Sequence, residues 1–536
     1  MTANIGAPRV SLRLLLLAGT ILSATSASFI APANAGNPPF VFDPGTLVIS
    51  SSTYDKTQGA VSHLSVGSKI GTTASAATAV ADNNYVNVWK NTSADGNFGV
   101  TSAITLTDID PATGSVLHQG SVPTDQVVTS FPSKSEGGLH ITQAWPNAHL
   151  VIVGYASPGV GALDVSNSDA VPGQDLSNPV TMAFGSNYAF ARTVVSIDSE
   201  GNIGYTPTIA YGGDNGRNGL LGSNGLYYMV GNSNAGKAAT FGNCPTPPVV
   251  STKTVNCTKP DVTETTGLEV VNPIDAMFLP TTIPANNSAE VDPLLMTIAG
   301  DKPGKDNNYR GVTEYGGALY FTKGSGSNGV QSVYTVTSQF PLPTVDQAGA
   351  ATIGIVPGFP TDVAKTSGGD YTPFAIFFAN ATTMYVSDEG TGDNTDATTH
   401  AGIQKWSLVD GTWYLDYVLS NGLMTTATNL NGPDGQYPDV TTIGLRNMTG
   451  VVNGNGNNST VTLWAATATT NAAVGTSAAG NTGADPNRIV MITDKLSATT
   501  MTNQVKNESF VTVAGPTYGT VYRGVAYVES LGQLKN

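Results

Sequence analysis

Cationic side chains recur in one kind of short run along this sequence. The runs are "SKSEGG" with Lys134, "NGRNGLLGS" with Arg217, "NYRGVTEYGG" with Arg310, "GLRNMTGVV" with Arg446 and "VYRGVAYVES" with Arg523. The whole chain holds only 23 lysines and arginines, so a cation repeated in one setting forms a pattern. Guanidinium groups offer paired donors that match a carboxylate or a phosphate. If the five side chains converge, we expect them to bind a small anionic or polar ligand.

The same pattern has a structural interpretation. Each arginine could tie neighbouring elements together by donating to backbone carbonyls or to a local carboxylate. The sequence alone leaves both interpretations open.

Acidic residues in a Gly-rich turn suggest a second kind of site. Asp388, Glu389 and Asp393 lie in "SDEGTGDN", and Ca²⁺ prefers hard oxygen ligands of this type. The spacing does not follow the helix–loop–helix calcium motif. We therefore expect either a Ca²⁺ site or turn acids that pair with the arginines.

Familiar catalytic motifs are missing from the sequence. It contains no G-x-S-x-G nucleophile turn and no H-E-x-x-H zinc pair. Its five histidines are scattered without ligand spacing, and packing or surface roles are expected for His140 and His149. A carboxylate pair acting as general acid and base would form only in three dimensions. Whether the protein is an enzyme stays open.

The scaffold for these residues is predicted to be all-β. Only 11% of residues are charged, against about 25% in typical domains. Residues 372–420 contain four β-like runs: "TPFAIFFAN", "TTMYVSDEG", "GIQKWSLVDG" and "TWYLDYVLS". Four successive antiparallel strands form one blade of a β-propeller. Similar units span 133–210, 215–273, 308–339 and 444–515.

The two ends of the chain supply the last unit. Residues 46–55 and 102–123 provide three strands, and the missing first strand is predicted at 521–529. This pairing would close the ring and leave no free sheet edge. We predict a single β-propeller over 36–536 with six or seven four-stranded blades. Six blades can be counted from the markers, and 155–192 or 273–300 could hold a seventh. Seven is favoured as the commoner ring size. A β-solenoid is the alternative, although its repeats are shorter and more regular.

In a propeller, the first strand of each blade lines the central channel. Lys134, Arg217, Arg310, Arg446 and Arg523 all stand at the start of a predicted first strand. We therefore expect them at one channel mouth.

The first 35 residues have the features of a signal peptide. Arg9 and Arg13 precede the apolar run "LLLLAGTIL", and Ala33-Asn34-Ala35 forms a small-x-small cleavage site. We expect cleavage after Ala35 and a secreted or periplasmic, soluble, monomeric protein without a transmembrane segment. The net charge of −15 disfavours nucleic acid as a partner.

The chain has two cysteines, Cys244 and Cys257, in a Pro/Thr-rich segment. In an exported protein they are expected to form one disulfide, within an insert near 241–265. A metal pair or a reactive thiol is the alternative, but the sequence shows no C-x-x-C motif and no nearby histidine.

Several longer runs resemble a family of exported, mostly bacterial, β-propeller-like proteins of uncharacterised activity. They are "YRGVTEYGGALYFTKGSGSNGV", "MYVSDEGTGDN", "GLRNMTGVV", "TSFPSKSEGGLHITQ", "ALDVSNS" and "YRGVAYV". The resemblance covers nearly the whole chain after residue 35 and implies a fold and an export route, without catalytic residues. A remote likeness to lactonase-type and phytase-type propellers concerns the fold alone.

Two functions are consistent with these features. The first is a secreted propeller that binds a small anionic or polar ligand at the arginine-lined mouth, with hydrolysis of a phosphoester or lactone, assisted by Ca²⁺, as an extension. The second is a non-catalytic envelope or extracellular protein that serves as an interaction platform.

Overall fold

The computed structural model describes most of the chain from Phe40 to Ser530. The residues left out within that span are 66, 71–76, 79–98, 132, 134–135, 143–145, 164, 168–189, 213, 233–238, 243–259, 281–282, 285–286, 292–306, 325, 327, 365–370, 392–399, 434 and 471–482. The predicted signal peptide, Lys134, Asp393, Cys244 and Cys257 therefore lie outside the described residues.

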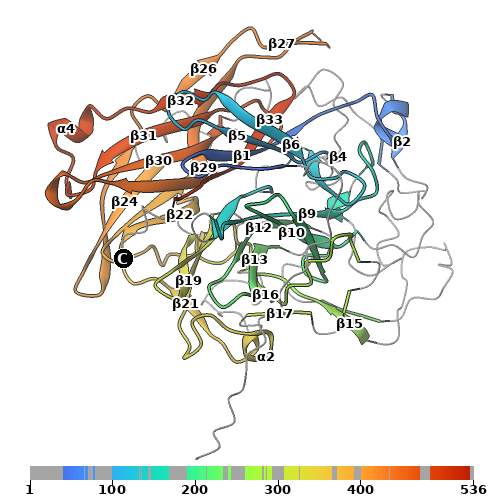
Figure 1. Cartoon of the computed structure of the whole chain (residues 1–536), viewed down its shortest axis with the longest axis horizontal. Helices are drawn as coiled ribbons and strands as arrows, with labels where there is room; N and C mark the ends of the chain where they lie inside the picture. The colour runs from blue at the N-terminus through green and yellow to red at the C-terminus, as the bar shows by residue number, and fades with distance from the viewer. Residues whose placement is uncertain are drawn as a thin grey trace, which may run out of the picture. The chain divides into compact units, whose positions relative to one another are not determined.

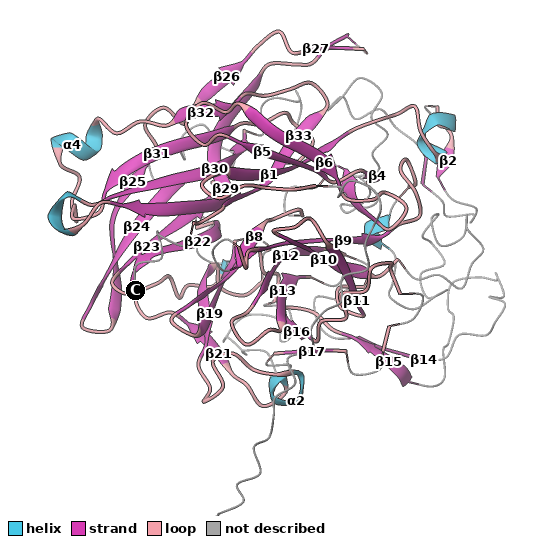
Figure 2. Cartoon of the chain, viewed as in Figure 1, coloured by secondary structure: helices cyan, strands magenta, loops and turns pink. Residues whose placement is uncertain are grey.

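The described residues form six antiparallel blades (Figures 1 and 2). Blade 1 is β33 (Thr520–Tyr527), β1 (Leu47–Thr53), β5 (Thr105–Ile109) and β6 (Val116–Ser121). Blade 2 is β8 (His140–Thr142), β9 (His149–Ala156), β10 (Arg192–Asp198) and β11 (Ile203–Thr208), extended by β7 (Val127–Phe131) and β4 (Val100–Ser102). Blade 3 is β12 (Gly216–Leu221), β13 (Tyr227–Gly231), β16 (Leu268–Val271) and β17 (Ser288–Glu290).

The other three blades follow in chain order. Blade 4 is β18 (Val312–Tyr315), β19 (Ala318–Lys323), β20 (Ser332–Val336) and β21 (Ile353–Ile355). Blade 5 is β22 (Pro373–Asn380), β23 (Thr383–Asp388), β24 (Gly402–Val409) and β25 (Thr412–Leu419). Blade 6 is β29 (Val440–Asn453), β30 (Thr460–Thr469), β31 (Ile489–Lys495) and β32 (Val511–Ala514), with β26 (Thr425–Ala427) on its inner edge.

The first strands of the blades form a closed ring around the channel. β33 contacts β8, and contacts continue from β8 to β12, β18, β22, β29 and back to β33. Figure 1 shows the same order, with colours that run round the ring from blue through green and yellow to red. The predicted closure is confirmed, because β1 pairs with β33 from Leu47↔Tyr527 to Thr53↔Thr520. The all-β propeller prediction is thus correct.

The blade count is six in the described residues, and the seventh blade that we favoured is not confirmed. Within 273–300, β17 is the fourth strand of blade 3. Within 155–192, the described residues include the end of β9 and the start of β10, both in blade 2.

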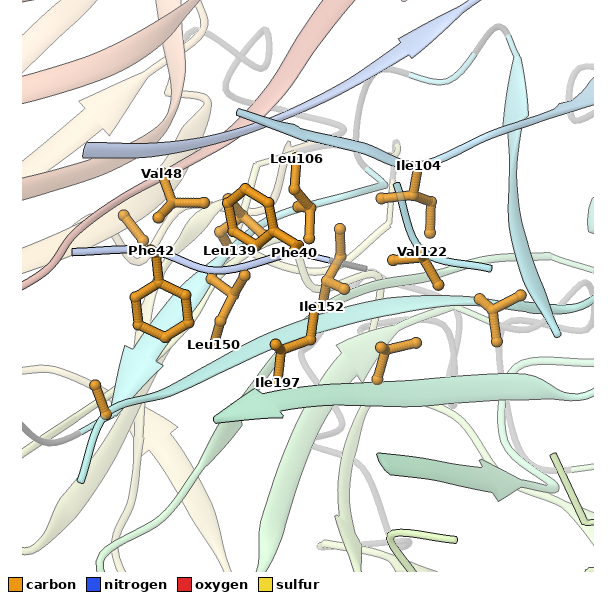
Figure 3. Packing of buried hydrophobic residues seen from close by; sticks show 14 of the residues in the cluster. Phe40, Phe42, Val48, Ile104, Leu106, Val122, Leu139, Leu150, Ile152 and Ile197 are labelled. Atoms are coloured by element: carbon orange, nitrogen blue, oxygen red, sulfur yellow. The ribbon is translucent and has the colours of Figure 1, made fainter. Parts of the chain in front are cut away.

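A hydrophobic cluster fills each interface between neighbouring blades. Figure 3 shows the cluster between blades 1 and 2, where Val48 and Leu106 face Leu150 and Ile152, with Phe42 from the segment before β1. Middle strands such as β9 are buried along nearly their whole length, because a blade packs against each face. The outer strand β6 has no buried residue, and its side chains, including Val116 and Leu117, are at least partly exposed.

Short elements complete the described structure. The small hairpins are β2 (Lys69–Ile70) with β3 (Ala77–Thr78), β14 (Ala239–Gly242) with β15 (Pro260–Glu264), and β27 (Asn431–Gly432) with β28 (Gly435–Gln436). The helices are η1 (Ala60–His63), η2 (Val165–Asn167), α2 (Val345–Ala348), η4 (Gly456–Asn458) and α4 (Asn503–Lys506). No helix among the described residues is long and apolar enough to cross a membrane.

The hairpin of β14 and β15 flanks the two cysteines. Its ladder pairs Gly242 with Pro260, so the chain leaves and re-enters the hairpin at neighbouring positions. The disulfide between Cys244 and Cys257 stays a prediction.

Candidate functional site

The four described arginines of the repeated runs lie at equivalent places on the channel strands. Arg217 is in β12, Arg310 precedes β18, Arg446 is in β29 and Arg523 is in β33. All four are at most 5% exposed. They differ in what surrounds the guanidinium group, and those differences separate structural arginines from a candidate binding residue.

Arg523 is held completely by the protein. Its Nε donates to Ser52 Oγ at 2.7 Å, and its two terminal nitrogens donate to the carbonyls of Ser130 and Ser133. Its charge also lowers the pKa of Glu136, which burial otherwise raises. Arg523 therefore joins blade 1 to blade 2, as the structural interpretation predicts.

Arg217 joins blade 3 to blade 4. Its Nε donates to Asn215 Oδ1 at 2.8 Å, and its Nη1 donates to the Tyr309 carbonyl at 2.9 Å and to the side chain of Asn308. Asp214 lies 4.0 Å away as a counter-charge. Most of its donors are thus used within the protein.

Arg446 is only partly satisfied. Its Nε donates to Glu389 Oε2 at 3.1 Å, which forms a buried ion pair between blades 6 and 5. Its Nη2 is buried and has no hydrogen-bond partner among the described residues. The Nη2 group of Arg446 can therefore still donate a hydrogen bond to a ligand.

Arg310 is the exception in the group. No described carboxylate lies within ion-pair distance, and its buried Nε has no hydrogen-bond partner in the described part of the chain. Phe374, the residue of blade 5 at the equivalent place, supports the cation with its ring centroid 5.7 Å from Cζ. Burial, together with the charges of Arg217 and Arg446, lowers the pKa of Arg310 to about 9, while Glu389 and Asp214 oppose this effect. Arg310 is therefore still a cation at neutral pH.

The described arginines differ in how near their counter-charges lie. Asp214 lies 4.0 Å from Arg217, Glu389 pairs with Arg446, and Glu136 interacts with Arg523. Arg310 has no described carboxylate within ion-pair distance and interacts with Glu389 and Asp214 only at longer range. A buried charge without a partner is costly. Since Arg217 and Arg446 both act on the pKa of Arg310, the structure brings these three predicted residues together.

The predicted calcium ligands are largely occupied by the protein. Asp388 is fully buried and accepts hydrogen bonds from the Thr372 and Gly390 N–H groups, the Thr372 hydroxyl and Gln404 Nε2. Burial raises its pKa to about 7. Glu389 pairs with Arg446, as the alternative interpretation of these acids anticipated. These two residues therefore offer few oxygens to a Ca²⁺ ion.

An asparagine pair crosses the channel directly after the arginine level. Asn218 Nδ2 donates to Asn447 Oδ1 at 3.2 Å, and Asn447 Nδ2 donates to the Arg523 carbonyl at 2.8 Å. A Cβ on Gly138 would lie 2.6 Å from Asn218 Nδ2, so glycine is required beside the pair. Blades 3 and 6 are opposite in the ring, and this contact therefore obstructs the channel between its two ends. Sequence reasoning missed it, although both asparagines directly follow a marker arginine.

A cavity of about 260 Å³ lies further along the first strands. Its lining comes from β8, β18, β22, β29 and β33 and includes His140, Glu314, Phe377, Met448 and Tyr527. Burial lowers the pKa of His140 to about 4, and a hydrogen bond with the Val312 backbone opposes this effect. His140 is thus a packed channel residue that stays neutral at pH 7, as expected for a packing role.

Acid should destabilise the protein through His140. Between the ordinary histidine pKa of about 6.5 and the folded value of about 4, the unfolded chain binds a proton that the folded chain does not. Stability should therefore fall as the pH drops through this window. His140→Gln should show a smaller fall in Tm from pH 7.5 to 4.5 than the wild type, while exposed His63→Gln should behave as wild type. Equal losses in both variants would contradict this assignment.

Comparisons with known proteins add no family. No protein-family model matches this sequence, and no curated protein matches it. The resemblance to exported bacterial propeller-like proteins therefore has no support from these comparisons. The fold that it implied is present: the described residues form a six-bladed β-propeller, and among them Arg310 beside the channel has no carboxylate within ion-pair distance and no hydrogen bond at Nε.

Proposed function

We propose that this propeller binds a small anion, a carboxylate or a phosphate monoester, at the level of Arg310. The observation that carries the proposal is the buried guanidinium of Arg310, which has no carboxylate within ion-pair distance and no hydrogen bond at Nε within the described residues. Arg446 Nη2 supplies a second free donor nearby. A bound anion would accept hydrogen bonds from both groups and give Arg310 a direct ionic partner.

Export belongs to this proposal, supported by the signal-peptide features of residues 1–35. We extend this proposal to hydrolysis of a phosphoester or a lactone. Assays of turnover with substrates of both classes would test it. The alternative is an envelope or extracellular interaction protein, in which Arg310 would have no small ligand.

Binding can be tested by thermal shift and calorimetry with small carboxylates, inorganic phosphate and phosphate monoesters. At a hundredfold excess over Kd, a ligand should stabilise the wild type by about 2.7 kcal/mol. Arg310→Met should abolish this effect and raise the Tm of the ligand-free protein, because it removes an unpaired buried charge. Exposed Lys506→Met serves as the control and should keep both properties of the wild type. An anion that stabilises Arg310→Met as strongly as the wild type would refute the proposal.

A further inference from the structure

Three potential metal ligands meet in blade 1, away from the arginines. Asp43 lies in the segment before β1, Asp108 is on β5 and His118 is on β6. Asp108 and His118 are directly opposite each other in the β5–β6 ladder. One ligand atom from each of the three residues lies within 4.8 Å of the others.

Hydrogen bonds already hold these side chains in place. His118 Nε2 lies 2.9 Å from Asp43 Oδ2, and the Asp43 N–H donates to Asp108 Oδ2 at 3.2 Å. The side chains of His118 and Asp43 are 41% and 54% exposed, so an ion and its water ligands can reach the group from solvent. The site thus combines a fixed inner residue with two accessible ones.

A separate observation points to a ligand at this group. Asp108 is 0% exposed, and its Oδ1 has no hydrogen-bond partner among the described residues. A carboxylate oxygen buried without a partner costs free energy, and native proteins normally satisfy such atoms. The Asp108 carboxylate lies beside two further groups that can bind a metal, the Asp43 carboxylate and the His118 imidazole.

We propose that Asp43, Asp108 and His118 bind one divalent transition-metal ion of the Zn²⁺ type. One imidazole nitrogen and two carboxylate oxygens suit Zn²⁺, which binds both at about 2.0–2.2 Å. Ligands at that distance in tetrahedral geometry stand about 3.4 Å apart, so the His118–Asp43 contact needs to open only slightly. Ca²⁺ and Mg²⁺ prefer sets made of oxygen alone and fit this group less well.

The ion would reinforce the closure of the ring. The Gly45 N–H donates to the Val528 carbonyl at 2.7 Å, and the Val528 N–H donates to the Thr46 carbonyl at 3.0 Å. A metal bound to Asp43 would therefore tie the segment that holds the end of β33 to the hairpin of β5 and β6. The site is structural in this role, independent of the anion proposed at Arg310.

The test uses the full chain, freed of metal with a chelator and titrated with Zn²⁺, Mn²⁺ or Ca²⁺ by calorimetry and thermal shift. We expect one Zn²⁺ per chain, a raised Tm, and weaker binding of Ca²⁺. Asp43→Asn and His118→Ala should each lose at least tenfold in Zn²⁺ affinity, since even outer-shell changes cost about 10–100-fold. Both changes are at exposed positions, so folding should persist, and exposed His63→Ala is the matched control. Absence of Zn²⁺ binding, or equal binding by all three variants and the wild type, would overturn the proposal.

Discussion

Replacing Arg523 by methionine is expected to destabilise the protein by about 3–5 kcal/mol. The change removes three donors at once and leaves the carbonyls of Ser130 and Ser133 without their partner. It also removes the charge that offsets buried Glu136. The loss should appear as a lower midpoint of urea unfolding with an unchanged slope.

Two further variants separate charge from geometry at this position. Arg523→Lys keeps the positive charge but not the three-way donor pattern, so it should recover only part of the loss. Arg310→Met removes an arginine whose Nε has no acceptor among the described residues, in contrast to Arg523, and should not destabilise the protein. Similar losses at Arg310 and Arg523 would show that both arginines are structural.

The second large effect is expected at Lys405. Its Nζ is fully buried and lies 2.8 Å from Asp494 Oδ2, which links blade 5 to blade 6. Nζ also donates to the carbonyls of Lys495 and Leu496. Lys405→Met would leave Asp494 as a buried charge without its cation, at a cost of about 3–5 kcal/mol.

A double replacement tests this explanation. Tyr385 and Tyr417 donate to Oδ2 and Oδ1 of Asp494 at 2.5 and 2.7 Å. Asp494→Asn removes the stranded charge and keeps one oxygen, which can still accept from one of the two hydroxyls. Lys405→Met combined with Asp494→Asn should therefore be more stable, in chemical unfolding, than the sum of the single losses predicts. Strict additivity would mean that the two residues contribute separately.

The two Tyr-Arg-Gly-Val runs show what the sequence could predict and what it could not. The local repeat of an aromatic residue, a glycine and a β-branched valine was enough to predict a channel strand at each run: Arg310 lies just before β18 and Arg523 lies within β33. The glycines are also explained: a Cβ on Gly311 would lie 2.1 Å from the Phe374 carbonyl oxygen. The strand position of each run and the need for its glycine thus follow from the local sequence pattern.

The different environments of the two arginines were not predictable from those runs. Arg523 meets the Ser52 hydroxyl from its own blade and backbone carbonyls from blade 2, whereas Arg310 meets the ring of Phe374 from blade 5. These partners are distant in sequence, and no feature within the tetrapeptide specifies them. The asparagine pair was missed for the same reason, since blades 3 and 6 meet only in the closed ring. The group of Asp43, Asp108 and His118 was missed because it depends on the strand register within blade 1.

Pairing between β1 and β33 has a consequence for the order of folding. The inner edge of blade 1 cannot be completed until β33 has been synthesised, so β1 keeps an open strand edge while the other blades are made. Contacts at this sequence separation carry the largest loop-closure entropy and form slowly. Completion of blade 1 should therefore be the last step of folding, and the period before it is when the chain is most exposed to misassembly with another copy.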